Sequence, residues 1–161
     1  MAKTRLRAGQ LLSGSAGSAD GFPDQTLRTS ALSQGQGCGE IVTFGSEDGT
    51  ESLAAGKLVY LNSSGVWKYT DADAESTTKG LLAIALGTSV SDGLLLRGFY
   101  KNGGTFSGAT FTVGGPVYVS ATAAQGTKTA PGSGDTVRII GWGVSSYVLY
   151  FNPDNNWVVM S

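Results

Sequence analysis

The residue types that most often carry out enzyme chemistry are scarce in this chain. It has no histidine and one cysteine, and charged residues form 14% of its 161 residues, against about 25% in an ordinary domain. Cys38 therefore has no imidazole to act as its base, and no neighbouring cation stands out to lower the pKa of its thiol. A zinc site would need imidazoles or paired thiolates. These absences predict a structural or binding protein with no catalytic residues, not an enzyme.

Two spacings resemble ligand sites without meeting the requirements of one. Asp71, Asp73 and Glu75 alternate as in the start of a calcium loop, but the glycine and the glutamate needed at the sixth and twelfth positions are missing. Gly49 and Gly56 suggest a phosphate loop, yet six residues separate them in place of four. We therefore expect a solvated loop at the three acidic residues and reject a phosphate loop at the two glycines, and we expect no metal ion and no cofactor.

The aromatic residues allow two interpretations. Exposed rings could form a sugar-stacking surface or an oligomer interface, because they give a large contact area at low entropic cost. The same rings could instead fill the core of a small β domain. The residues concerned are Trp67, Trp142, Trp157, Tyr60, Tyr100, Tyr118, Tyr147 and Tyr150.

Charge and hydropathy exclude several classes of partner. The net charge of −1 and the pI of about 5.3 give no broad positive field, so we expect no nucleic acid partner. The longest apolar stretch, residues 81–86, is far shorter than the roughly 20 residues that cross a bilayer, so we expect no membrane partner. The N-terminus lacks the apolar run of a secretory signal, and the unpaired Cys38 favours synthesis in the reducing cytoplasm.

Residues 1–40 differ in composition from the rest of the chain. Serine, glycine, alanine, glutamine, threonine and aspartate dominate there, and the large apolar side chains follow no regular period. Such a segment cannot fold alone, so we interpret it as an extended docking arm whose isolated large side chains anchor it to another chain. A disordered or cloning-derived tail is the alternative. The candidate partner-binding residues of the arm are Arg5, Leu6, Arg7, Leu11, Leu12 and Phe22.

Residues 41–161 are predicted to form one all-β domain, a single antiparallel β-sandwich or barrel-like structure. Apolar and β-branched runs alternate with glycine-rich turns, as at residues 62–65 and 102–104. No window keeps a helical apolar period, so helix should be minor. The expected strands are residues 40–44, 57–61, 66–69, 81–86, 94–99, 109–113, 116–120, 135–142, 146–151 and 157–160.

An internal sequence similarity suggests that this domain contains two similar halves, at about residues 50–105 and 106–161. The strand around Tyr60 resembles the strand around Tyr118, and in each half a polar loop, an apolar strand ending in glycine and a further strand follow. Unrelated segments that share the same residue preferences for strands and turns could produce the same match without duplication.

Several segments of this domain together carry a family resemblance. They are AGKLVYL (55–61), Trp67, TDADA (70–74), KGLLAIALG (79–87), the strand from Gly93 to Gly98, and GPVYV (115–119). They resemble the β-rich structural modules of tailed bacteriophages that occur in capsid decoration (cement) proteins and in head or tail fibres. The likeness covers roughly residues 50–155 and leaves the arm unmatched.

The resemblance implies a non-enzymatic virion protein with no small-molecule substrate. As a cement protein it would form a homo-oligomer, commonly a trimer, and bind the major capsid protein on the outer surface of the head. Arg5 and Arg7 would then pair with acidic capsid residues while the apolar anchors fill recesses. The alternative is a head or tail fibre module that contacts a host glycan, which requires an exposed aromatic groove.

Overall fold

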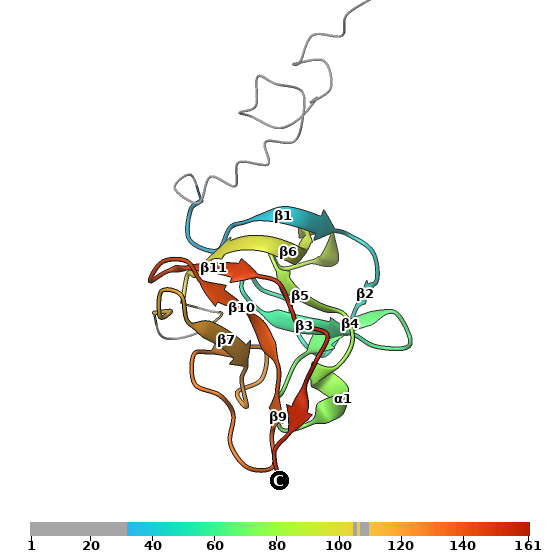
Figure 1. Cartoon of the computed structure of the whole chain (residues 1–161). Coiled ribbons are helices and arrows are strands. Elements are labelled where there is room, and N and C mark those ends of the chain that lie inside the picture. The colour runs from blue at the N-terminus through green and yellow to red at the C-terminus, as the bar shows by residue number, and fades with distance from the viewer. Residues whose placement is uncertain (1–31, 105, 107–109) are drawn as a thin grey trace, which may run out of the picture.

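The computed structural model describes residues 32–104, 106 and 110–161, and these form an all-β domain (Figure 1). The fold class predicted from the sequence is confirmed. Helix within the described residues is limited to α1 (Glu75–Thr78) and a 3₁₀ turn at Val90–Asp92. The strands are β1 (Gly37–Val42), β2 (Ser46–Glu47), β3 (Leu58–Leu61), β4 (Val66–Tyr69), β5 (Leu82–Ala85), β6 (Leu94–Lys101), β7 (Pro116–Val119), β8 (Gly126–Thr127), β9 (Thr136–Val137), β10 (Ile139–Gly143), β11 (Val148–Phe151) and β12 (Val158–Val159).

The expected strands differ from the observed ones in several places. The strand expected at 40–44 is β1 at Gly37–Val42, the two-residue strands β2 and β8 have no counterpart in the prediction, and two further strands are missing or interrupted. The strand expected at 109–113 is absent from its described residues, 110–113. The amide of Phe111 instead donates to the carbonyl of Ser146, which lies in the turn between β10 and β11, and the Phe111 ring packs against Phe106. The strand expected at 135–142 is divided into β9 and β10 by Arg138, whose side chain is buried. Apolar patterning alone could not show either interruption.

Ten strands form one large sheet in the order β2-β4-β3-β5-β6-β11-β10-β7-β8, with β1 added beside β6. All pairings in it are antiparallel except β2 with β4. The chain after β7 returns to the first strands, since the amide of Leu58 donates to Ala124 O (2.9 Å) and that of Ala124 donates to Thr70 O (2.8 Å). These bonds bring the two ends of the sheet together in a barrel-like closure.

The strand order of the sheet is symmetric about the β6–β11 pair. On one side β6 is followed by β5, β3 and β4, and on the other side β11 is followed by β10, β7 and β8. The strands of Tyr60 and Tyr118, matched in the sequence, occupy corresponding places in this order. The arrangement is what two similar halves would produce, although the duplication itself stays a prediction.

The inner face of the curled sheet forms the main core. Side chains from both halves meet there, and the aromatic rings of Tyr100 and Phe106 lie 5.8 Å apart at its centre. Complete burial of such aliphatic and aromatic side chains contributes roughly 1.5–3 kcal/mol each. The fully or nearly fully buried members are Leu58, Ala72, Leu82, Ile84, Leu95, Tyr100, Phe106, Phe111, Val117, Val119, Ile140, Leu149 and Phe151.

A second core covers the outer face of the first half only. Trp67 is fully buried there, and its indole nitrogen donates to the Phe44 carbonyl at 2.7 Å. Leu53 and Val90, which lie between strands, pack in the same cluster as alternate residues of β3 and β5. The loops of the first half therefore cover its outer face, so Trp67 serves as a core residue.

Strands β1 and β6 cross at a pair of glycines that face each other, Gly39 and Gly98. Both have positive φ, 142° and 144°. A Cβ on Gly98 would lie 2.8 Å from the Gly39 Cα and closer still to the Cys38 carbonyl oxygen. Only glycine allows this approach, so β1 depends on the pair for its place beside β6.

We predict that Gly98→Ala lowers the free energy of unfolding by about 3 kcal/mol, because the methyl group meets backbone atoms that cannot move without breaking the β1–β6 pairing. Urea unfolding followed by tryptophan fluorescence measures the change. Gly132→Ala is the matched control, since Gly132 has open space around its Cβ position and no positive φ. The control should leave stability unchanged or raise it by up to about 1 kcal/mol; equal effects of the two substitutions would contradict the explanation.

Candidate functional site

The cysteine that the sequence analysis weighed for chemistry is part of the sheet, and Lys57, which follows Gly56 of the rejected phosphate loop, lies directly before β3. Cys38 lies in β1 opposite Phe99, is partly buried, and has the pKa of its thiol raised by that burial. A raised pKa reduces the thiolate fraction and hence reactivity. Lys57 places its amine 5.1 Å from the centre of the Tyr69 ring. Its position is that of a cation over an aromatic face.

The alternating acidic residues lie in the polar loop that leads into α1. The Asp71 carboxylate accepts from the backbone amide of Asp73 at 3.1 Å, and the negative charge of Asp71 is the main reason why the pKa of Asp73 is raised. Glu75 accepts instead from the indole nitrogen of Trp157 at 3.1 Å. Within residues 32–104, 106 and 110–161, no group of three or more histidine, cysteine, aspartate or glutamate side chains is placed to hold a metal ion.

The six candidate anchors of the arm, Arg5, Leu6, Arg7, Leu11, Leu12 and Phe22, lie outside the described residues. The end of the segment assigned to the arm does lie within them. The Leu32 carbonyl accepts from the Lys101 amine at 2.8 Å, Gly35 N donates to Lys101 O, and β1 begins at Gly37. Residues 35–40 are therefore attached to β6 through main-chain hydrogen bonds, and Leu32 is attached through the Lys101 side chain.

The aromatic residues divide between the two interpretations. Trp67 and Tyr100 are fully buried, and the Tyr100 hydroxyl has no hydrogen-bond partner among the described residues, with burial raising its pKa to about 12. Trp142, Tyr147 and Trp157 remain 45%, 54% and 38% exposed. These three exposed rings belong to the second half of the domain and to its C-terminal segment.

A row of side chains runs from β6, the last strand of the first half, across the outer face of the second half. Phe99 in β6 pairs with Tyr150 in β11, which pairs with Trp142 in β10, and directly paired residues project from the same face. The Phe99 and Tyr150 rings lie 5.1 Å apart. The exposed Arg97 donates to the Tyr150 hydroxyl at 3.3 Å, and this bond raises the pKa of Arg97. We call Phe99, Tyr150 and Trp142 the aromatic row.

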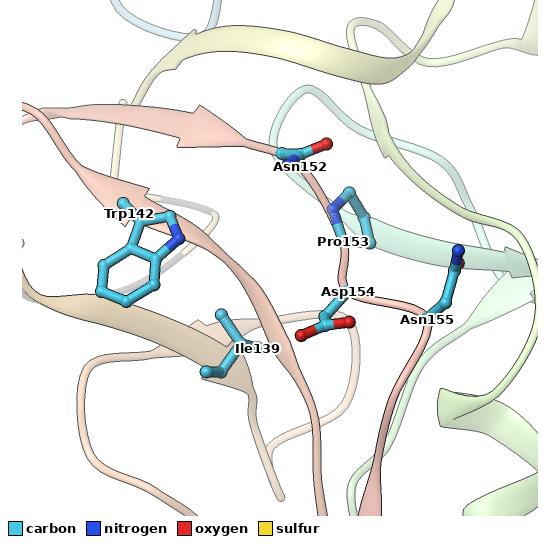
Figure 2. Close-up of a pocket in the computed structure, with 6 residues that line it drawn as sticks. All are labelled: Ile139, Trp142, Asn152, Pro153, Asp154 and Asn155. Atoms are coloured by element: carbon cyan, nitrogen blue, oxygen red, sulfur yellow. The ribbon is translucent and has the colours of Figure 1, made fainter.

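A pocket of about 390 Å³ opens beside the Trp142 end of the aromatic row. Ile139 and Trp142 line it from β10, and the chain that follows β11 supplies the opposite wall (Figure 2). Figure 2 shows the Asp154 carboxylate directed toward the β10 side chains. We call this the Trp142 pocket; its lining residues are Ile139, Trp142, Asn152, Pro153, Asp154 and Asn155.

Main-chain bonds and one buried arginine hold the wall of the Trp142 pocket. The amides of Asn152 and Asp154 donate to the carbonyls of Ile140 and Ile139, both at 2.9 Å. Behind them Arg138, 3% exposed, donates from Nε to the Asp154 carbonyl at 2.8 Å. Its Nη1 donates to the carbonyls of Thr78 and, at 2.9 Å, of Gly80. Arg138 thus ties the pocket wall to the chain after α1.

Burial lowers the pKa of Arg138, and the negative charge of Asp154 opposes this effect. A guanidinium in water titrates so far above neutral pH that Arg138 stays charged. The charge is satisfied by backbone carbonyls, which is one of the ways a buried cation is tolerated. Arg138 therefore acts as a positioning residue.

The C-terminal segment carries a second exposed apolar surface. Trp157, Val158, Val159 and Met160 are 38%, 61%, 52% and 41% exposed. Val158 and Val159 form β12, whose strand pairing in the described part of the chain is limited to the two residues of β9. We call these four residues the C-terminal patch.

Sequence reasoning identified Trp142 and Trp157 among the ambiguous rings but missed the polar wall of the Trp142 pocket and Arg138. Residues 152–156, Asn-Pro-Asp-Asn-Asn, carry only the signal of a turn after an apolar strand. Their position beside Trp142 depends on the β10–β11 register, which a single sequence does not display.

Comparisons with protein-family models, with curated proteins and with solved structures return no match for this chain. In the part of the chain that the structure describes, no helix has the length and apolar character needed to cross a membrane.

We predict that Arg138→Met lowers the free energy of unfolding by about 3 kcal/mol, because buried carbonyls that accept from the guanidinium lose their donor. Chemical denaturation monitored by circular dichroism measures the loss. Arg97→Met is the matched control: Arg97 is exposed and its guanidinium donates to the Tyr150 hydroxyl and not to buried carbonyls of the described residues, so the change should be below about 1 kcal/mol. A smaller loss for Arg138→Met than for Arg97→Met would refute the anchoring role.

Proposed function

We propose that this protein is a structural component of a phage virion, a capsid decoration (cement) protein that binds the outer surface of the head as a homo-oligomer. The proposal includes a non-enzymatic role and the major capsid protein as partner. The observation that carries it is the C-terminal patch, a surface that a monomer leaves exposed to water.

The C-terminal patch has the properties of an interface between chains. Its residues are consecutive, yet all are exposed, whereas a strand on a covered sheet would bury alternate side chains. A two-stranded sheet such as β9–β12 is marginally stable in water. The free edge of β12 also presents backbone groups that another strand can pair with. A partner that covers the patch would bury its apolar side chains and pair the free edge of β12.

We infer that the partner is a second copy of this chain, and that three copies form a closed ring. Closed symmetric assemblies are the usual outcome when one surface of a chain contacts another surface of its copy. Each contact then buries the apolar side chains of one patch, and the ring leaves no patch free. A trimer also agrees with the family that the sequence resembles.

The attachment to the head is assigned to the N-terminal arm. The chain enters the domain at β1, at the opposite end of the molecule from the C-terminus and β9 (Figure 1). We therefore assign the contacts between copies to the C-terminal end of the domain and the attachment to the shell to the end at which the chain enters β1. Each bound copy adds contact area between capsid subunits, so the stabilisation of the shell grows with occupancy through linked binding.

A second candidate function is supported by a different observation. A head or tail fibre module that contacts a host glycan requires an exposed aromatic groove, and the Trp142 pocket offers one. The cement assignment rests on the C-terminal patch and the arm, so the two functions can be tested separately.

We predict that Val158→Asp converts the assembly to monomers. The added carboxylate would be buried without a partner in every copy of the interface, which costs several kcal/mol. Light scattering at micromolar concentration should give about three times the 16.5 kDa chain mass for the unchanged protein and a single chain mass for the variant. Val113→Asp, at a valine that is 65% exposed outside the patch, should leave the mass unchanged. A monomeric unchanged protein would contradict the proposal.

We predict that removal of residues 2–30 abolishes binding to purified phage heads while the oligomer persists, because the anchors that fill recesses on the shell are lost. Co-sedimentation with the heads measures binding, and light scattering checks the oligomer. Undiminished binding of the shortened protein would remove the arm from the docking mechanism.

A further inference from the structure

The Trp142 pocket combines an apolar ring with exposed polar side chains that have no hydrogen-bond partner among the described residues. Trp142 is 45% exposed and stands at one side, with Ile139 next to it on β10. Asn152 and Asn155 line the other side, and neither side chain makes a hydrogen bond to any described residue. Each amide can both donate and accept. The pocket therefore offers a flat apolar surface facing unused hydrogen-bonding groups (Figure 2).

The Asp154 carboxylate is held in a fixed orientation between these two sides. One of its oxygens accepts from the backbone amide and from the side-chain amide of Asn156, at 3.1 and 3.0 Å. The Asp154 main chain is fixed by Ile139 and Arg138. An oriented carboxylate is a strong acceptor for a hydroxyl donor, and a wall fixed in advance lowers the entropy cost of binding.

The charges around the pocket select against anions and metal ions. The residues that line it include one carboxylate and no lysine or arginine. The nearby Arg138 guanidinium is buried and already donates to three backbone carbonyls. A phosphate or a carboxylate ligand would meet the Asp154 charge without a cation to balance it. A divalent cation would find one carboxylate where it prefers several oxygen ligands.

We propose that the Trp142 pocket binds a neutral pyranose unit of a glycan. A pyranose ring has a face of C–H groups that can stack on the Trp142 indole, and equatorial hydroxyls at its rim that can reach the Asp154 carboxylate and the two amides. The volume of about 390 Å³ lies at the lower end of the range of about 300–1,000 Å³ for small-molecule sites, which suits a mono- or disaccharide unit.

The aromatic row gives a longer glycan a path out of the pocket. Tyr150 is paired directly with Trp142, and Phe99 continues the row on the same face. Successive sugar units could lie over these rings, each with a small stacking contribution. The inference deepens the second candidate function, on which it rests, and is independent of the assembly role, because the pocket lies within one chain and outside the C-terminal patch.

The test is a glycan array probed with the fluorescently labelled full-length protein, with neutral, sialylated and phosphorylated glycans printed side by side. We expect binding to a subset of neutral glycans. The strongest of these, titrated against the protein in solution, should change the tryptophan fluorescence. Trp142→Ala should weaken this binding by more than about tenfold, as for loss of a central aromatic contact, and Asn155→Ala should weaken it less.

Tyr147→Ala is the matched control, because Tyr147 is an exposed aromatic residue (54%) that does not line the pocket. It should bind the glycan as the unchanged protein does. Trp142→Phe keeps a stacking ring and should retain part of the affinity, and thermal unfolding of each variant verifies that it folds. Absence of binding to every neutral glycan, binding confined to charged glycans, or equal binding by the Trp142→Ala variant would each overturn the proposal. None of these outcomes depends on oligomer formation or on binding to heads, so the two proposals fail independently.

Discussion

Burial of one continuous inner face holds the domain together. Strands from both halves place alternate side chains in the same core, so a shift of any strand by one residue would exchange its buried and exposed sets. The bonds of Leu58 and Thr70 with Ala124 close the sheet around this core. Once the inner register is fixed, the residues on the outer face are fixed as well. The aromatic row is therefore a consequence of how the core packs.

The two halves of the sheet use their outer faces differently. In the first half, loop residues such as Leu53 and Val90 join Trp67 in a second core. In the second half, Trp142 stays exposed and Tyr150 partly exposed. Covering a sheet face adds stability, whereas an uncovered aromatic face remains free for recognition. The two halves, although similar in strand order, therefore differ: the first has its outer face covered by a second core, and the second leaves aromatic side chains accessible.

The features that we connect with assembly and with ligand binding lie at separate places in the domain. β1 receives the chain at one end, the C-terminal patch lies at the other, and the Trp142 pocket opens on β10 between them. Arg138 connects two of these regions. It holds the Asp154 carbonyl of the pocket wall, and its guanidinium carbon lies 6.0 Å from the centre of the Trp157 ring in the C-terminal patch. A single buried cation therefore supports both surfaces.

The sequence by itself determined the all-β class, most of the strands and the turn at residues 62–65, where the Asn62 side chain accepts from the amides of Ser64 and Val66. Strand and turn preferences are local, and a single sequence displays them. The tertiary structure alone decided which tryptophans are buried and which are exposed, the break at Arg138, and the meeting of Trp142 with residues 152–155. These features depend on strand register and on the closure of the sheet, which arise from contacts between residues far apart in the chain and leave no local pattern to read.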